Sequence, residues 1–526
     1  MYCIQTSIVL IYLSPFAMSI SIGIVRVAIL PRILLMAFLF RFLLVIFLGA
    51  SDAVIPDHNA GDDVLKFDLR SSSTCFCLQG HVCDPDWKSY DAPSGSHRSC
   101  VEVGSSRNGF FSRFFLQPMT KWDAARFLML AANGKRREPA GGVDDPFLDS
   151  EQAHAFFPMF PLMIRRGALF LIQSLPKTFL PPTFEGVLVL SALVINTVSF
   201  AIALMCLVDL TLRLTLPNDK AIHVAGMVAT LFCMNPASIF FATSYSESFF
   251  AMCTFGGYAL YTSGYFYLAV IPWMAASYTR SNGCLVAAWL LMEGVAVCLQ
   301  VNRTMMQRVT SLTCHVLLAV AVVAPAVFHD RAGYHVHCNR EVQPEWCDSD
   351  MGSLYAYVQR THWNVGLFRY FELKQIPNFL LASPILFCSA WGVSRWIRIS
   401  WKDHMSQYSG RGGIFYFYQW ATRALFRSVV DSSPSNCVDN ILHGPKMLSH
   451  YAVLAAVAML GLTVAHVQIT TRLICSSCPA IYWHMAYLCD TETRIFGLSA
   501  RFLICVYLSI FIVIGTILHV NGFPWT

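Results

Sequence analysis

Repeated apolar stretches of about 20 residues restrict the fold of this sequence more than any other feature. A helix of about 20 apolar residues crosses a bilayer core about 30 Å thick. Clear candidates are residues 31 to 50, 184 to 210, 221 to 242, 247 to 266, 310 to 328, 376 to 398, 449 to 469 and 501 to 520. Apolar residues make up 56% of the chain and charged residues only 13%, which is unlike a soluble protein. We therefore expect an all-α polytopic membrane protein with about 8 to 11 transmembrane helices.

Two further apolar regions are less regular. Residues 266 to 300 are interrupted at Arg280-Ser281-Asn282-Gly283, which predicts two short crossings or a re-entrant pair around a polar turn. Residues 7 to 25 fit either a signal-anchor or an extra helix. We expect an N-terminal hydrophobic segment at residues 1 to 30 and a single polytopic domain at residues 31 to 526.

Positive charge indicates orientation, because cytosolic loops beside membrane helices are enriched in Lys and Arg. Such residues in the segment from 395 to 446 are Arg395, Arg398, Lys402, Arg411, Arg423, Arg427 and Lys446. A cytosolic loop is therefore expected at about residues 399 to 448, and the net charge of +6 is no nucleic-acid signal. Counting crossings outward places on the lumenal side residues 51 to 165, 329 to 375 and 470 to 498, with the turns at 244 to 247 and 280 to 283. The Asn302-Arg303-Thr304 sequon falls on the cytosolic side and is expected to stay unmodified.

Polar loops contain two groups of cysteines. Cys75, Cys77, Cys83 and Cys100 lie in one loop, and Cys338 and Cys347 lie in another. Disulfides are expected in both loops if they face an oxidising lumen, and the sequence leaves their pairing open.

A Trp-Asp pair opens an amphipathic stretch in the first long loop. Trp122 and Asp123 precede Leu128 and Leu130. An aromatic side chain and the bilayer would desolvate the acid and improve it as a base toward a sugar hydroxyl. The alternative is that Asp123 caps a helix while Trp122 belongs to the interfacial aromatic belt.

Glu151 and His154 stand three residues apart, just before an apolar run. At helical spacing they share one face. A metal-binding pair is conceivable, but two ligands are too few for a metal site. The alternative is a hydrogen-bonded surface pair, and no metal is expected.

Acidic and basic groups also occur at membrane depth. Glu247 follows the break at Asn235-Pro236, and an acid in that position is costly and usually functional. It could equally sit in the first turn of a helix and favour the helix dipole. Arg280 and Asn282 separate two apolar runs, where a cation would suit an anionic phosphate.

Residues 344 to 379 combine aromatic side chains with amides and cations that suit a sugar-phosphate headgroup at an interface. The polar or aromatic members that we predict to bind substrate are Trp363, Asn364, Arg369, Lys374, Gln375 and Asn378. Farther on, His466, Gln468 and Arg472 are expected to belong to the same lumenal surface. A lone His466 would more often be an interior histidine.

Together these passages resemble the glycosylphosphatidylinositol (GPI) mannosyltransferase II family. The resemblance runs in order from about residue 115 to residue 526. Its blocks are Trp122-Asp123, His154-Ala-Phe-Phe-Pro158, Asn235-Pro-Ala-Ser-Ile239, Tyr245-Ser-Glu247-Ser, Arg280-Ser-Asn-Gly283, Trp363-Asn-Val-Gly366, Gln375-Ile-Pro-Asn-Phe379, His466-Val-Gln468 and Pro524-Trp-Thr526. The chain departs from the family at Arg126, where His or Tyr is more usual, and in an insertion at about 55 to 115.

The resemblance implies a C-type glycosyltransferase fold in the endoplasmic reticulum membrane, with a lumenal active site. It implies transfer of an α-1,6-linked mannose from dolichyl-phosphate mannose to the mannosyl-glucosaminyl-phosphatidylinositol precursor, by one inverting displacement without a cofactor. Asp123 would be the catalytic base. The residues expected to bind substrate are those above together with Trp122, Glu151, His154, Glu247, Arg280, Asn282, His466 and Gln468. Both substrates are lipid-linked, and the need for an accessory subunit is left open.

Three alternatives remain at this point. Another mannosyltransferase using the same donor would share the donor site. A polytopic lipid or sugar transporter would use the broken helices near Glu247 and Arg280 as gates, although no inverted repeat is visible. A catalytically inactive scaffold would not need Asp123.

Overall fold

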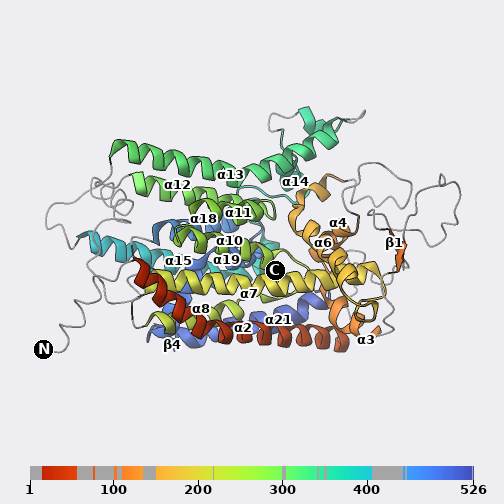
Figure 1. Ribbon diagram of the computed structural model, residues 1–526, viewed down its shortest axis with the longest axis horizontal. Coiled ribbons are helices and arrows are strands. Elements are labelled where there is room, and N and C mark those ends of the chain that lie inside the picture. The colour runs from red at the N-terminus through yellow and green to blue at the C-terminus, as the bar shows by residue number, and fades with distance from the viewer. Residues whose placement is uncertain are drawn as a thin grey trace.

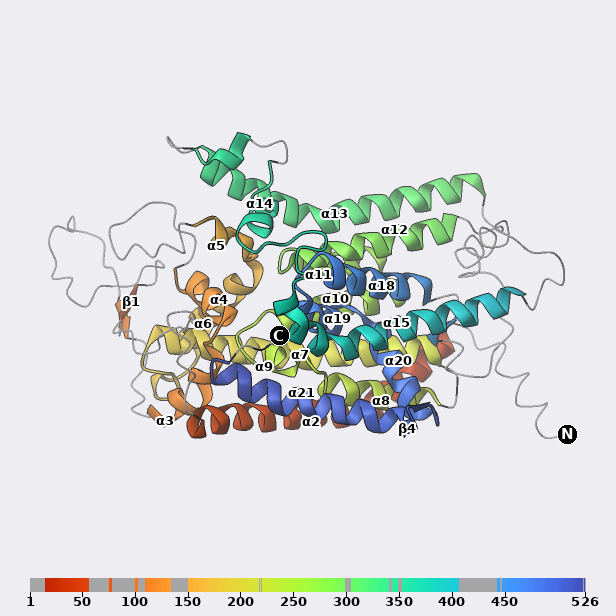
Figure 2. The same cartoon turned by 180° about the vertical axis from the view of Figure 1, so that it is seen from behind.

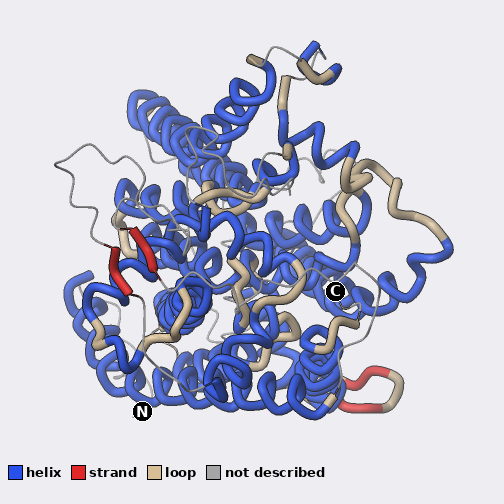
Figure 3. Tube along the Cα trace, turned by 90° about the vertical axis from the view of Figure 1, so that its right-hand side faces the viewer, coloured by secondary structure: helices blue, strands red, loops and turns tan. Residues whose placement is uncertain are grey.

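The computed structural model has helices on all sides, and among the described residues only two short pairs of strands (Figure 3). The structure describes residues 15–55, 75–77, 100–102, 109–133, 150–216, 218, 220–298, 304–339, 343–348, 352–405, 442–444, 447–523 and 525. Several predictions lie wholly or mainly outside these residues: most of the 55 to 115 insertion with Cys83, the sequon at Asn302-Arg303, the basic residues of the loop from 406 to 441, and Lys446.

The chain forms a long series of helices. The α-helices are α2 (Pro15–Val54), α3 (Gly109–Phe111), α4 (Asp123–Asn133), α5 (Glu151–Ala155), α6 (Met159–Ser174), α7 (Phe184–Thr215), α8 (Ala221–Cys233), α9 (Ser238–Ala242), α10 (Glu247–Thr262), α11 (Phe266–Ser277), α12 (Leu285–Cys298), α13 (Met305–Cys338), α14 (Leu354–Thr361), α15 (Ile376–Met405), α18 (Leu448–Thr463), α19 (Thr470–Ser477), α20 (Pro479–Asp490) and α21 (Ala500–Val520). Short turns include η2 (Ser112–Leu116), η3 (Gln117–Met119), η4 (Lys177–Phe179), η5 (Ser281–Cys284), η6 (Glu345–Asp348), η7 (Leu373–Gln375) and η9 (Val467–Ile469). The antiparallel strand pairs are β1 (Cys75–Cys77) with β2 (Cys100–Glu102), and β3 (Arg494–Ile495) with β4 (Leu498–Ser499).

Six helices of the described part are long and apolar enough to cross a bilayer. They are Ile29–Val54, Phe184–Thr215, Ser281–Cys298, Met305–Cys338, Leu373–Ser400 and Ala500–Val520, and shorter apolar helices accompany them. The prediction of an all-α, multi-pass membrane protein is confirmed.

The long helices run side by side along the longest axis of the molecule (Figures 1 and 2). Helices α3, α4 and α6 lie at one end, on the right in Figure 1, which we call the α4 end. The β3–β4 turn lies at the other end, which we call the hairpin end. Bulky fully buried side chains such as Trp273, Trp483 and Tyr451 fill the interior between the helices.

The predicted crossing at 221 to 242 is wrong as a single helix. Helix α8 ends at Cys233, and α9 begins only at Ser238. Asn235 makes the break, since its side-chain amide donates to the Phe232 carbonyl at 2.8 Å and its side-chain oxygen accepts from the Ala237 amide at 2.9 Å. Pro236 follows it and cannot donate to a helical hydrogen bond.

The segment from 470 to 498 is not a lumenal loop as predicted. Residues of α19 and α20 are almost wholly buried, and α20 packs against α8. Asp490, which ends α20, lies 3.2 Å from His223 at the start of α8, at the hairpin end. The segment therefore returns along the bundle, and α21 runs back to the α4 end. Sequence reasoning missed this crossing because Arg472, serines and a proline interrupt its apolar run.

The N-terminal alternatives are resolved in part. Helix α2 begins at Pro15 and continues without a break to Val54, with Pro31 inside it. The C-terminal half of the 7 to 25 run thus belongs to the same helix as the first crossing, whose span is Ile29–Val54, while residues 1 to 14 lie outside the described part.

A disulfide joins Cys338, the last residue of α13, to Cys347 of η6. This pairing, which the sequence left open, lies in a segment predicted to be lumenal. Disulfides persist in oxidising compartments. In the other cysteine group, the antiparallel strands β1 and β2 set Cys77 opposite Cys100.

We expect a digest of the unreduced protein from cells to contain the Cys338–Cys347 cross-linked peptide. The closed loop is short, so Cys338→Ser should lower the stability of its surroundings by about 2–3 kcal/mol, measured by thermal unfolding in detergent. The buried free thiol variant Cys475→Ser serves as the unpaired control. Complete alkylation of both cysteines in the unreduced native protein would contradict the bond and the lumenal placement.

Candidate active site

Three charged side chains form a buried ion cluster. The side chain of Glu247 is 0% exposed. One of its oxygens, Oε1, accepts hydrogen bonds from Arg280 Nη1 at 2.6 Å and from Arg472 through Nη2 at 2.6 Å and Nε at 2.7 Å. Charges are tolerated at such depth only when they are paired and hydrogen-bonded. We call these three residues the Glu247 clamp.

The clamp joins three parts of the chain that the broken helices bring together. Glu247 opens α10, where a carboxylate also favours the helix dipole. Arg280 is extended and lies between α11 and η5. Arg472 belongs to α19. Glu247 does lie in the first turn of a helix, as one of the two predictions stated. That prediction is incomplete, because the ion-pair partners of Glu247 come from distant parts of the sequence.

Aromatic rings complete the surroundings of the clamp. The Arg472 guanidinium lies 4.3 Å from the centre of the Phe240 ring and 4.8 Å from that of Tyr245. Cations are attracted to such ring faces. Two guanidinium groups and one carboxylate leave the clamp with one unbalanced positive charge.

Asp123, the first residue of α4, faces the clamp from its outer side. Its Oδ2 atom lies 3.7 Å from Arg472 Nη1, and its side chain is 52% exposed. This exposure is contrary to the predicted desolvation by Trp122, whose indole donates to the His519 carbonyl of α21 at 3.1 Å. The carboxylate is therefore both open to an approaching molecule and next to a buried cation.

The residues before Asp123 fix the start of α4. Trp122 has a φ of 63°, an uncommon conformation for a bulky residue. Such strain persists only where surrounding contacts impose it. Lys121 is 1% exposed and donates to Asp52 of α2 at 2.6 Å and to the Val520 carbonyl of α21. Helices α2 and α21 thus hold Asp123 in place.

A second polar cluster, the Tyr370 network, joins the start of α15 and the loop before it to the segment between α18 and α19. Asn378 donates to Gln375 at 2.7 Å and to the Tyr370 hydroxyl at 2.8 Å, and that hydroxyl donates to Gln468 at 3.2 Å. The His466 ring stacks on Tyr370 with centroids 4.6 Å apart. Burial raises the pKa of Tyr370, although the hydrogen bond from Asn378 opposes the shift. Gln375, Asn378, His466 and Gln468 were predicted to share one surface, and the structure brings them together.

The loop from Trp363 to Arg369 is fastened to the end of α18. The Gly366 amide donates to the Val464 carbonyl at 3.1 Å, and the Trp363 carbonyl accepts from His466 Nε2 at 2.5 Å. Asn364 and Phe368 of this loop have φ values of 49° and 56°, a conformation that Asn tolerates and that is uncommon for bulky Phe368. Burial lowers the pKa of His466, opposed by its bond to Trp363, so the ring is neutral at pH 7.

Two predicted cations lie on the surface instead. Arg369 is exposed and donates to the Arg360 carbonyl at 3.4 Å. Lys374 is 74% exposed and pairs with Glu372 at 2.6 Å. Neither belongs to the clamp, in which Arg472 is the cation that lies 3.7 Å from Asp123.

Glu151 and His154 connect α5 to the disulfide region. Glu151 accepts from the Trp346 indole at 2.6 Å and lies 3.4 Å from His362 Nε2. His154 Nδ1 lies 3.4 Å from His337 Nε2. Within the described residues no group of three or more His, Cys, Asp or Glu side chains is arranged to hold a metal ion. Absence of a metal from the reaction remains a prediction.

Sequence reasoning gave too little weight to Arg472 and overlooked Lys121 and Tyr245. Arg472 was expected only as part of a lumenal surface, although a basic residue within a mostly apolar helix could have marked it. No local signal distinguishes Lys121, because its partners lie 69 and 399 residues away.

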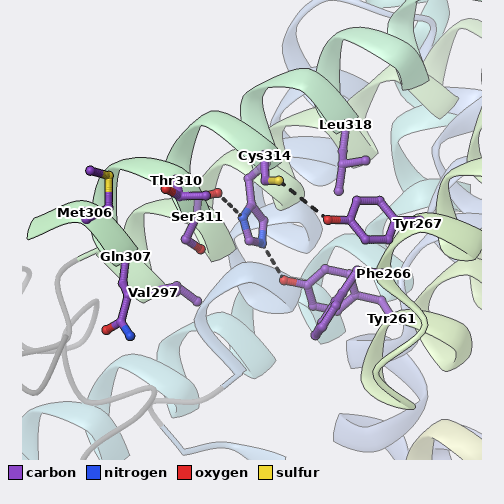
Figure 4. Close-up of a pocket in the computed structure, with 11 residues that line it drawn as sticks. Tyr261, Phe266, Tyr267, Val297, Met306, Gln307, Thr310, Ser311, Cys314 and Leu318 are labelled. Atoms are coloured by element: carbon purple, nitrogen blue, oxygen red, sulfur yellow. Dashed lines mark hydrogen bonds between the residues drawn. The ribbon is translucent and has the colours of Figure 1, made fainter. Parts of the chain in front are cut away.

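A hollow of about 440 Å³ lies elsewhere, at the far end of α10 (Figure 4). Tyr261 donates there to His315 Nε2 at 2.8 Å, while His315 Nδ1 donates to the Ser311 carbonyl at 2.7 Å. Tyr261 is near the C-terminus of α10, whereas Glu247 begins that helix. The hollow is therefore separate from the clamp.

Comparisons with known proteins converge on one family. The family model described as Mannosyltransferase (PIG-V) matches residues 96–526. The mouse protein named GPI alpha-1,6-mannosyltransferase 2 is 28% identical over 86% of this chain and 82% of its own length. The human protein of that name is 26% identical over 78% and 87%, and GPI mannosyltransferase 2 of Drosophila pseudoobscura pseudoobscura is 27% identical over 80% and 91%. No solved structure matches the chain significantly.

Removing the clamp carboxylate should unfold the centre of the bundle. Glu247→Ala leaves two buried guanidinium groups without their partner, so we expect a loss of about 3–5 kcal/mol in the free energy of unfolding, measured by denaturant titration in detergent. Glu372→Gln breaks an exposed pair and should change this value by less than about 0.5 kcal/mol. Equal stability of the two variants would show that the clamp does not hold the helices together.

Acidification should weaken the Tyr370 network. The folded-state pKa of His466 is lowered, so its contribution to stability is present above about pH 6.5 and is lost as the pH falls through the folded-state value. The thermal unfolding temperature of the wild type should therefore fall more steeply between pH 7.5 and pH 5.5 than that of His466→Asn. Parallel pH profiles of the two proteins would show that His466 does not cause the loss of stability at low pH.

Proposed function

The chain belongs to the PIG-V mannosyltransferase family, and on that premise we propose that it adds the second, α-1,6-linked mannose to the GPI precursor. The acceptor is the mannosyl-glucosaminyl-phosphatidylinositol lipid and the donor is dolichyl-phosphate mannose. The names of the mouse and human relatives support this reaction. One observation of this chain carries the proposal: the half-exposed Asp123 carboxylate lies 3.7 Å from the buried Arg472.

The enzyme is a multi-pass membrane protein, and we place it in the endoplasmic reticulum with its active site lumenal and its fold of the C type. The disulfide at Cys338–Cys347 supports this orientation, because it lies beyond α13 in the segment that packs with α5 near the α4 end. Both lipid-linked substrates would reach this end from the lumenal leaflet.

Asp123 acts as the general base. Its carboxylate takes the proton of the acceptor hydroxyl while that oxygen attacks the anomeric carbon of mannose. The bond between this carbon and the phosphate oxygen breaks, and dolichyl phosphate leaves with the electron pair. Because the donor linkage is β and the product linkage is α, one displacement with inversion accounts for the stereochemistry.

Arg472 serves both reacting partners. Its position 3.7 Å from Asp123 is fixed because two of its nitrogens are bound to Glu247. Preorganised charge of this kind stabilises charge that develops in the transition state. Once Asp123 has taken the acceptor proton, the net positive charge of the clamp suits the departing phosphate.

Asn282 is a further contact for the donor phosphate. Its side-chain nitrogen is buried and has no hydrogen-bond partner within the described part of the chain. A buried unsatisfied donor is costly, so a bound oxygen at this position would remove that cost. Asn282 lies two residues after Arg280 of the clamp, and this proximity along the chain supports the proposal that both contact one headgroup.

The Tyr370 network suits the sugar-bearing acceptor. It presents amide and phenol groups from Gln375, Asn378, Gln468 and Tyr370, and the neutral His466 ring packs beneath Tyr370. Trp363, at the start of the adjoining loop, packs edge-on against Phe156 after α5. Glu151 and His154 then support this loop region from α5.

Loss of the base should abolish transfer but not folding. With membranes containing Asp123→Asn we expect kcat to fall by about 10² to 10⁴-fold, measured by mass spectrometry of the one-mannose and two-mannose precursors. The Asp209→Asn control changes a carboxylate that pairs with Arg213 near the other end of α7 and should keep wild-type kcat. Wild-type turnover by Asp123→Asn would exclude Asp123 as the base.

A further inference from the structure

A second hollow of about 590 Å³ lies at the hairpin end, between α2, α8, α20 and α21. In Figures 1 and 2, β4 is labelled at this end, α8 lies next to it, and α2 and α21 run along the bundle to it. Most of its lining is apolar and includes Ile33, Met36, Ile222, Met227, Leu231 and Leu508. We call it the hairpin groove.

The floor of the hairpin groove has room for an acyl chain. A Cβ atom built on Gly226 of α8 would meet no protein atom within 4 Å. Exposed apolar side chains continue around it, with Leu35 69%, Ile222 49% and Phe502 54% exposed. In a membrane-spanning bundle such a surface faces lipid.

The polar lining of the groove is mainly cationic. Arg32 and Arg501 both line it, both are exposed, and neither has a carboxylate within ion-pair distance in the described part of the chain. The acid in the lining, Asp490, lies 3.2 Å from His223. The arginines, lysines, aspartates and glutamates of the lining are Arg32, Arg501 and Asp490, which give a net charge of +1 that complements a single phosphate.

The depth of these arginines matches that of a lipid headgroup. Arg32 is near the start of the span Ile29–Val54, and Arg501 is the second residue of the span Ala500–Val520. Long basic side chains at helix ends extend to the membrane interface. The end of α15 with Arg395 and Arg398 also points to this side as cytosolic, where anionic lipids attract basic residues.

We propose that the hairpin groove binds one anionic phospholipid of the cytosolic leaflet. Its phosphate lies between Arg32 and Arg501, and an acyl chain passes over Gly226. This lipid is neither donor nor acceptor, because Asp123 is at the opposite end of the bundle. It links α2 with α21, the two helices whose other ends hold Lys121 and Trp122.

Native mass spectrometry of the full chain in nonionic detergent tests the proposal. The probes are palmitoyl-oleoyl phosphatidylserine and phosphatidylcholine, which share acyl chains and differ in net charge. The wild type should retain one phosphatidylserine more tightly than phosphatidylcholine. The Arg32→Gln, Arg501→Gln double variant should bind phosphatidylserine about 10- to 30-fold more weakly, since each basic group near the surface contributes about fivefold.

Two further variants separate this site from general surface charge. Arg398→Gln removes an exposed arginine of α15 outside the groove and should leave phosphatidylserine binding unchanged. Gly226→Leu fills the floor while keeping both arginines and should weaken binding of the same probe. Equal retention of the two lipids by the wild type, unchanged binding by the double variant or by Gly226→Leu, or an equal loss in Arg398→Gln would each overturn the proposal.

Discussion

Glu247 is fully buried, and through one oxygen it holds Arg280 from the turn before α12 and Arg472 from α19. A single carboxylate at membrane depth would be costly, and so would either guanidinium alone. Because each of these charges needs the others as partners, the cluster fixes the position of three helices that break inside the bundle. It also places Arg472 where its third nitrogen faces Asp123 at 3.7 Å. The geometry of the active site thus depends on a buried ion cluster that fixes Arg472 beside Asp123.

Asp123 needs a second set of fixed contacts, because α4 is a short helix outside the long bundle. Lys121 and Trp122 supply them by bonding to the ends of α2 and α21. The strained backbone at Trp122 is maintained by these bonds. The acid can therefore remain half exposed to substrate while its backbone is held from two sides. The hairpin groove lies between the opposite ends of the same two helices, and a lipid bound there would stabilise their packing.

Apolar run length was sufficient to predict the class of fold and most long helices. It was insufficient where polar residues interrupt a crossing, as at Asn235-Pro236 and in α19–α20, because a buried polar side chain can be satisfied by partners that the local sequence does not show. The same reason explains which contacts of the candidate active site could be predicted from the sequence. The grouping of Gln375, Asn378, His466 and Gln468 was predictable from their clustering in polar segments. The pairing of Glu247 with Arg472 spans 225 residues and the anchoring of Lys121 spans 399, so only the folded chain shows them.

We propose that this chain transfers the second GPI mannose with Asp123 as base. The decisive experiment uses cells that lack the second GPI mannosyltransferase and express either the wild-type chain or Asp123→Ala at equal levels in the endoplasmic reticulum. We expect the wild type to convert the one-mannose precursor and restore surface display of GPI-anchored proteins, whereas the variant should leave that precursor accumulated. Restoration by both chains would contradict the role of Asp123, and persistence of the one-mannose precursor with the correctly located wild type would contradict the proposed reaction.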